Sequence, residues 1–224
     1  MNQENHNIHK SNFLRAAVLG ANDGTISSSS LIVGLAASGL DKQSIIVASM
    51  SAIIAGALSM AAGEYVSVSS QSDIEKADIE KEKEALKNYP NEELKELEEI
   101  YISRGVSKEL ARKVALELSQ KDALEAHIRD ELGIDSHNIA KPLRAAAISA
   151  TTFLLGAIFP LLNLLFFDIA KIMQFQLIFT TMLLAILGSI AAFMSGANVV
   201  KGSLRIALVG AFAIILTNNI GKLF

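Results

Sequence analysis

The sequence of 224 residues contains no cysteine, so it forms no disulfide, no thiolate zinc site and no iron–sulfur cluster. Any metal that it binds must use carboxylates, histidine, methionine or backbone oxygen. Charged residues make up only 19% of the chain. There is no basic excess, because 20 Lys and Arg stand against 23 Asp and Glu, and this balance argues against nucleic-acid binding.

The sequence also lacks the motifs of several enzyme and pump classes. It has no Gly-x-x-x-x-Gly-Lys phosphate loop, no Gly-x-Ser-x-Gly nucleophile elbow and no His-Glu-x-x-His zinc motif. The Glu-x-x-His pair of a ferritin-like di-iron bundle is absent as well. We therefore expect that the protein is not an enzyme.

Apolar residues are abundant, at 51% of the chain with a mean hydropathy of +0.38, which is too apolar for an ordinary soluble domain. A helix that crosses a bilayer needs about 20 apolar residues. Four uncharged runs occur, at residues 43–63, 145–167, 172–200 and 206–221. The first three are long enough, and the last is bordered by Arg205 and Lys222, which can snorkel to the interface.

A fifth apolar stretch, residues 14–40, is interrupted by Asp23. It could form two short surface helices, because Asn22-Asp23-Gly24 is a turn signal. We favour one spanning helix with an intramembrane carboxylate. Five spans place the termini on opposite sides, and the distribution of Lys and Arg puts the N-terminus in the cytoplasm.

Residues 71–141 form a charged insert that holds 18 of the 23 acidic and 12 of the 20 basic residues. Its composition predicts helices at about 71–87, 92–103, 108–118 and 121–132, the first continuing the second span. The prediction is an all-α membrane protein with five transmembrane helices and a cytoplasmic helical metal-binding bundle inserted between the second and third spans. Its parts are an N-terminal cytoplasmic tail at 1–12, spans 1 and 2 at 13–70, the acidic bundle at 71–141 and spans 3 to 5 at 142–224.

Three residues in the first two spans are candidates for a transport pathway. Asp23 and Glu64 are ionisable groups in apolar segments, where such groups are costly. Met60 and Glu64 are four residues apart, so a thioether and a carboxylate share one helix face and would suit a first-row divalent metal. The structural alternatives are a carboxylate that is paired with Lys or Arg or kept neutral by burial, a core methionine, and a Glu64 that lies at the membrane interface.

Glutamates of the insert are spaced so that they could chelate a cation. Glu80 and Glu84 are four residues apart, Glu96 and Glu99 are three apart, and Glu131 lies near the end of the last helix with Glu82, Glu125 and His127 nearby. Interleaved lysines make a solvated, salt-bridged face the competing interpretation. His6, His9 and His137 are expected in solvent.

Several segments together resemble the vacuolar iron transporter family, and the chain looks like a bacterial-type member. They are Asn22-Asp23-Gly24, the run AGALSMAAGEYVS at residues 55–67, the acidic run after Gln71, and Asp130-Glu131-Leu132-Gly133. The resemblance implies a five-span homodimer that exports Fe2+, and often Mn2+, from the cytosol in exchange for protons.

The resemblance also implies roles for individual residues. Asp23 and Met60 match pathway residues of the family. Glu96, Glu99 and Glu131 align with cytoplasmic glutamates that collect metal. On the first helix of the insert, Glu82 aligns best when counted back from Pro90, whereas Glu80 and Glu84 form the same-face pair.

The sequence departs from plant-type members at Ala52, where they carry a pathway glutamate, and Glu64 could supply that carboxylate. We expect a multi-pass integral protein of a bacterial inner membrane, with no tightly bound cofactor and with Fe2+ or Mn2+ as the transported and regulatory ion. Its partners would be the lipid bilayer, divalent metal ions, protons and a second copy, and no nucleic acid. The alternative function is a non-transporting membrane metal sensor or scaffold.

Overall fold

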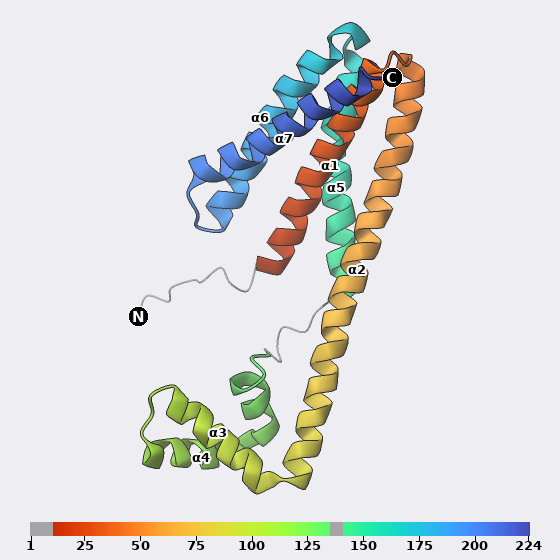
Figure 1. The fold of residues 1–224 in the computed structure, drawn as a ribbon. Helices are drawn as coiled ribbons and strands as arrows, with labels where there is room; N and C mark the ends of the chain where they lie inside the picture. The colour runs from red at the N-terminus through yellow and green to blue at the C-terminus, as the bar shows by residue number, and fades with distance from the viewer. Residues whose placement is uncertain (1–10, 135–140) are drawn as a thin grey trace. The chain divides into compact units, whose positions relative to one another are not determined.

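The computed structural model describes residues 11–134 and 141–224, with side chains from Arg15 onward. Residues 1–10 of the predicted tail and His137 lie outside the described residues. Every regular element in the described residues is a helix, which confirms the all-α prediction (Figure 1). The elements are α1 (Ser11–Ala37), α2 (Lys42–Asn88), α3 (Pro90–Ser103), α4 (Lys108–Asp130), α5 (Pro142–Phe166), η2 (Ile169–Lys171), α6 (Ile172–Met194) and α7 (Val199–Gly221).

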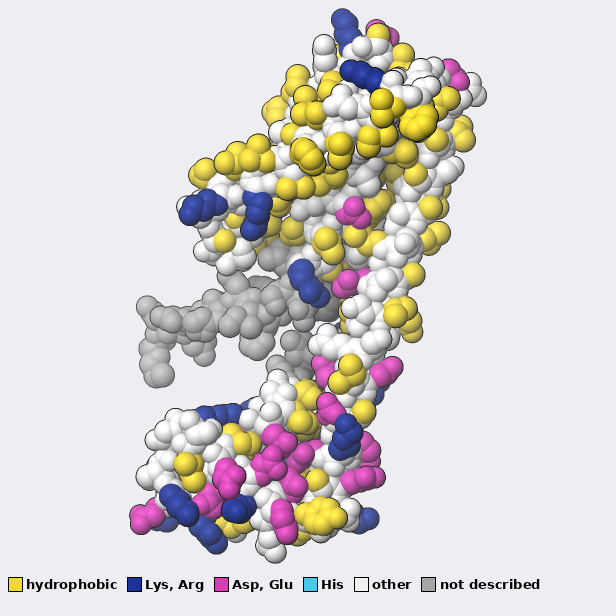
Figure 2. Space-filling view, in the orientation of Figure 1, with side chains coloured by type: hydrophobic (Ala, Val, Ile, Leu, Met, Phe, Trp, Pro, Cys, Tyr) yellow, Lys and Arg dark blue, Asp and Glu magenta, His cyan; other side chains and the backbone are white. Residues whose placement is uncertain are grey.

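The chain forms two compact units. One comprises Met1–Tyr65 and Pro142–Phe224, and the other comprises Val66–Lys141, which contains the whole predicted insert. Helix α2 contributes residues to both units, because it continues without a break to Asn88, as the sequence predicts. In the space-filling view, acidic and basic side chains gather over α3 and α4, whereas apolar side chains cover much of α6 and α7 (Figure 2).

Four helical stretches of the described chain are long and apolar enough to cross a membrane: α2, α5, Ile169–Met194 and α7. Helix α1 is not among them. Its 27 residues include Asp23 and four consecutive serines, which lower its hydropathy. It contacts α5, α6 and α7, so within its own unit the least apolar helix packs against three apolar ones.

Glycines let α1 and α5 approach backbone to backbone. A Cβ atom at Gly24 would overlap the carbonyl group of Phe153 on α5, and a Cβ at Gly156 would overlap the carbonyl group of Ala21 on α1. Small residues at such crossings allow van der Waals packing and close polar contacts between apolar helices. The α1–α5 crossing therefore depends on the absence of side chains at these two positions.

A proline inside α5 adds polar links at the same crossing. Pro160 has no N–H, so the carbonyl of Gly156 loses its helical partner. The hydroxyl of Thr25 on α1 lies 3.0 Å from that carbonyl oxygen and 2.7 Å from the Ala21 carbonyl oxygen, so its one hydrogen is shared between the two. Gln176 of α6 donates from Nε2 to the Pro160 carbonyl at 2.6 Å. These bonds satisfy backbone groups that lipid could not satisfy.

The second unit is a small bundle around Leu97, Ala115 and Ala126, with α3 and α4 in contact. Helix α4 is interrupted at Asp122, whose backbone is extended at φ −164° and ψ 96°. The Asp122 carboxylate accepts a hydrogen bond from the Glu125 amide at 3.0 Å and so caps the segment that follows. Two helical segments therefore occur where the sequence predicts the helices at 108–118 and 121–132.

Candidate functional site

Four potential metal ligands converge in the second unit. One ligand atom from each of Glu82, Glu93, His127 and Glu131 lies within 4.8 Å of the other three. The Nδ1 atom of His127 is 2.9 Å from Oε2 of Glu131, 3.0 Å from Oε1 of Glu82 and 3.9 Å from Oε2 of Glu93. We call these four residues the acidic cluster.

The helices of the bundle place each member of the acidic cluster. Glu82 lies on α2, and Glu93 lies in the first turn of α3, which begins at Pro90. His127 and Glu131 are four residues apart at the end of α4, so they share a face. The backbone then leaves the helix at Gly133, whose φ of +65° suits a glycine after a helix end.

Burial leaves the acidic cluster short of polar partners. His127 is fully buried, and Glu82 is 6% exposed. Nδ1 of His127 forms a hydrogen bond with Glu131. Oε1 of Glu82 is near the same nitrogen but is buried and has no hydrogen-bond partner among the described residues. A buried carboxylate oxygen without a donor is costly, and a cation bound among these ligands would stabilise it.

Two glutamates in this region have a raised pKa. Burial raises the pKa of Glu82, and the charge of Glu131 raises it further, although His127 acts in the opposite direction. Burial followed by the charges of Glu131 and Glu93 likewise raises the pKa of Glu96, which therefore lies within electrostatic reach of the acidic cluster. Three carboxylates and an imidazole form a mixed oxygen and nitrogen set that suits first-row divalent metals better than Ca2+ or Mg2+.

The structure separates the predicted glutamates into two groups. Glu82 and Glu131 belong to the acidic cluster, and Glu96 lies near it. Glu80, Glu84 and Glu99 lie outside the cluster and are exposed: Glu80 pairs with Lys83 at 3.0 Å, and Glu99 pairs with Lys95 at 3.7 Å. Sequence reasoning did not assign Glu93 and His127 as ligands. The spacing of His127 and Glu131 on a predicted helix was the available signal for His127.

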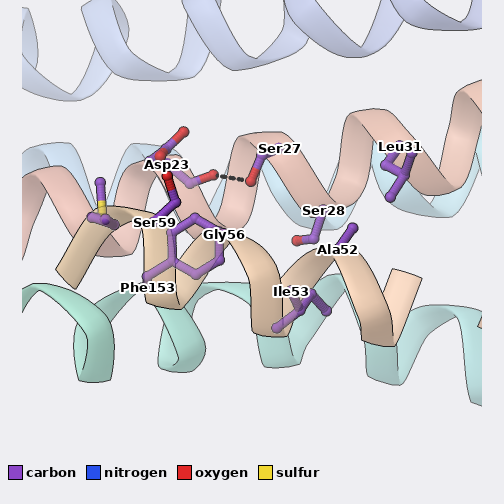
Figure 3. Close-up of a pocket in the computed structure, with 10 residues that line it drawn as sticks. Asp23, Ser27, Ser28, Leu31, Ala52, Ile53, Gly56, Ser59 and Phe153 are labelled. Atoms are coloured by element: carbon purple, nitrogen blue, oxygen red, sulfur yellow. Dashed lines mark hydrogen bonds between the residues drawn. The ribbon is translucent and has the colours of Figure 1, made fainter. Parts of the chain in front are cut away.

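A second candidate site is a cavity of about 440 Å³ in the unit that contains the apolar helices. Helices α1, α2 and α5 line it (Figure 3). Its lining residues are Asp23, Ser27, Ser28, Leu31, Ala52, Ile53, Gly56, Ser59, Met60 and Phe153. The predicted pathway residues Asp23 and Met60 thus border one cavity, whereas Glu64, one turn beyond Met60, is half-buried and does not line it.

The polar lining of this cavity is rich in acceptors. Asp23 is its only acidic residue, and Ala52 lies at the position where the resemblance places a glutamate. The hydroxyl of Ser27 donates to the Asp23 carbonyl at 2.6 Å, and that of Ser28 donates to the Gly24 carbonyl. Because these hydroxyl hydrogens bond within α1, the oxygen lone pairs remain available to a cation.

Comparisons with known proteins identify the family of this chain. A family model described as the VIT family matches residues 14–222. A protein of Acanthamoeba castellanii named "Vacuolar iron transporter" is 43% identical over 216 residues, which cover 94% of this chain and 78% of that protein. "Vacuolar iron transporter homolog 2" of Arabidopsis thaliana is 32% identical, covering 96% of this chain and 85% of its own length. The resemblance drawn from the sequence motifs is thereby confirmed, and the chain belongs to the VIT family, a family of transporters rather than of enzymes.

Proposed function

We propose that the protein is a divalent metal/proton antiporter that exports Fe2+, and also Mn2+, from the cytoplasm. The observation that carries this proposal is the acidic cluster, a set of three carboxylates and one imidazole in a chain of the VIT family, in which Glu82 and His127 are buried and Glu131 is open to solvent. The names of the relatives refer to iron transport, and they support iron as the transported metal.

In this proposal the acidic cluster collects the cation from the cytoplasm. Its carboxylates carry more negative charge than one imidazole can offset, so a divalent ion gains both ligands and charge neutralisation there. The exposed Glu80, Glu84 and Glu99 would raise the local concentration of cations through their field, and Glu96 would exchange the ion with the cluster.

The cavity beside α1 would form part of the pathway through the membrane. The Asp23 carboxylate and the Met60 thioether would bind the ion after it has lost part of its water, with the serine oxygens replacing that water. Asp23 would release its proton when the ion arrives and take one up when the ion leaves. Glu64 would serve the pathway one turn from Met60.

We further propose that α1 also spans the membrane, which brings the number of spans to five, and that the protein is a homodimer. Asp23 is exposed on α1 of a single chain, and a carboxylate facing lipid would be costly. Large apolar side chains of α2 are also exposed and could pack against a second copy of the chain. They include Val47, Met50, Ile54 and Leu58. The N-terminus would lie in the cytoplasm, and the membrane would be a bacterial inner membrane.

Metal flux in proteoliposomes tests this function. Purified protein is reconstituted with a metal-sensitive dye inside and a pH-sensitive dye outside, and Fe2+, Mn2+, Zn2+ and Ca2+ are added in turn. We expect metal uptake with proton counter-flow, both lost in Asp23→Asn and Met60→Ala. Metal binding without flux in the intact protein would overturn antiport and support the sensor or scaffold instead.

A further inference from the structure

The last turn of α4 is fastened to the end of α3 by one carboxylate. Asp130 accepts hydrogen bonds from Tyr101 Oη at 2.7 Å, from Arg104 Nη1 at 2.9 Å and from Arg129 Nη2 at 2.7 Å. Arg104 also donates from Nη2 to the main-chain oxygen of Asp130 at 2.6 Å. We call Tyr101, Arg104 and Asp130 the Asp130 clamp.

The charge of Asp130 is fully engaged by these donors. Its side chain is only 9% exposed. Burial raises the pKa of Asp130, but the hydrogen bonds from Arg129, Arg104 and Tyr101 outweigh burial and hold the pKa well below its ordinary value. Because both carboxylate oxygens accept from donors and two guanidinium groups neutralise the charge, Asp130 has little capacity to bind a cation itself.

The segment that the clamp holds is short. Asp122 interrupts α4, so only residues 123–130 form the helical segment that carries His127 and leads into Glu131. A helix of about eight residues is not stable by itself in water and needs tertiary contacts. Asp122 caps the start of the segment, and the Asp130 clamp fixes its end.

The segment makes polar contacts with α3 near both of its ends, and Ala126 between them lies in one apolar cluster with Leu97 of α3. His127 approaches Glu93 in the first turn of α3, and Asp130 binds Tyr101 in the last turn of α3 and Arg104 just after it. The two polar contacts, one near each end, fix the direction of the segment along α3 more firmly than the apolar cluster between them does alone. Glu131 follows Asp130 directly, so a shift of the clamp moves a ligand of the acidic cluster.

We propose that the Asp130 clamp is a positioning device that holds His127 and Glu131 in the arrangement that binds a divalent cation, an inference that rests on the metal binding proposed above. Asp130 is then a positioning residue and not a ligand. Partners that orient the ligands of a metal site typically change its affinity about 10–100-fold when they are lost.

Mn2+ binding to the full chain in detergent tests this role, with free Mn2+ measured by electron paramagnetic resonance. We expect Asp130→Asn to weaken binding about tenfold or more, because the new amide group faces donors, and Tyr101→Phe to weaken it less. Arg112→Gln is the matched control. It removes a 3.9 Å ion pair between α4 and Glu98 of α3 without touching the clamp, and it should keep the affinity of the unaltered protein.

Co2+ spectra separate positioning from mere stability. The visible absorption of bound Co2+ depends on its ligands and their geometry, so we expect an altered spectrum in Asp130→Asn and in Tyr101→Phe. In the Glu131→Gln background, Asp130→Asn should cause a smaller further loss of Mn2+ affinity than it causes alone. If circular dichroism shows that Asp130→Asn unfolds the bundle, the Co2+ spectrum of Tyr101→Phe tests the positioning role instead.

Unchanged affinity and an unchanged Co2+ spectrum in the folded clamp variants would overturn the positioning role alone. The positioning role would also be overturned if Asp130→Asn lowered Mn2+ affinity by the same factor in the Glu131→Gln background as it does alone. If the unaltered protein fails to bind Mn2+, the proposed function and the clamp both fail. If it binds Mn2+ but moves no metal across a membrane, antiport fails and the clamp stands.

Discussion

Replacing Glu82 by glutamine should change stability and metal affinity in opposite directions. Two carboxylate charges 4.8 Å apart, the largest separation among the cluster's ligand atoms, repel by about 3.5 kcal/mol at an effective dielectric constant of about 20. Glu82 has two such neighbours, Glu93 and Glu131. The carboxylates relieve part of the repulsion by rotating and by taking up protons, so we expect Glu82→Gln to raise the free energy of unfolding of the metal-free bundle by about 1–2 kcal/mol.

Hydrogen–deuterium exchange of the full chain measures the stability of the bundle. A gain of about 1–2 kcal/mol slows the exchange of the most protected amides between residues 93 and 131 about 5–30-fold. The same variant loses a ligand, so its affinity for Mn2+ should fall by at least the roughly 10–100-fold that loss of an outer-shell partner costs.

Asp73→Asn is the matched control, because it removes one negative charge from the same helix at an exposed position outside the acidic cluster. We expect it to leave both exchange and Mn2+ affinity close to those of the unaltered protein. Faster exchange in Glu82→Gln, or an unchanged Mn2+ affinity, would refute the view that Glu82 is a repelled ligand in the metal-free state.

Three further predictions concern pH, packing and transport. The pKa of Glu82 and that of Glu96 are raised above the ordinary 4.5, so the folded bundle holds more protons than the unfolded chain just above pH 4.5. Stability of the metal-free bundle should therefore fall, and Mn2+ affinity should rise, as pH increases through that window. Asp130 acts in reverse, because its lowered pKa gives stability that is lost as pH falls below 3.8, and circular dichroism from pH 3 to 7 checks both signs. Gly24→Ala should destabilise the apolar unit by about 1–3 kcal/mol, because its Cβ meets the Phe153 carbonyl. Gly63→Ala, which meets nothing within 4 Å, should not, and equal thermal inactivation of the two would contradict the α1–α5 crossing. Asp23→Asn should abolish metal-dependent proton flux while leaving Mn2+ binding by the bundle intact, and normal proton flux in this variant would exclude Asp23 as the coupling group.

Much of the fold follows from composition. Uncharged runs predict the apolar parts of α2, α5, α6 and α7, because only long apolar helices satisfy their backbone in lipid. The break near residue 120 is also foreseen, and the structure assigns it to the Asp122 cap. Helix α1 is harder, because its polar residues are matched by partners far along the chain. Nothing in the local sequence shows that Thr25 faces Gly156 or that Gln176 faces Pro160.

The metal ligands were only partly predictable for a related reason. Glu80, Glu82 and Glu84 alternate along α2, and their spacing shows which share a face but not which face meets α3 and α4. That choice is made by the rotation of α2 against its neighbours, which is a tertiary property. The pair of His127 with Glu131 was visible as an i,i+4 spacing, whereas Glu93 gains its meaning only when α3 packs beside His127.

The bond between Thr25 and Gly156 joins residues 131 positions apart, and this separation bears on how the protein is made. Helix α1 leaves the ribosome before the helices that it contacts, α5, α6 and α7. Until α6 arrives, Ser29 of α1 lacks Gln176 and Thr180, and the Gly156 carbonyl of α5 lacks Thr25 until α1 docks. Assembly of this unit therefore closes only after α5, α6 and α7 have been made. During that interval, α1 lacks the three helices that it contacts, and a chain cut short before α5 would leave it without them.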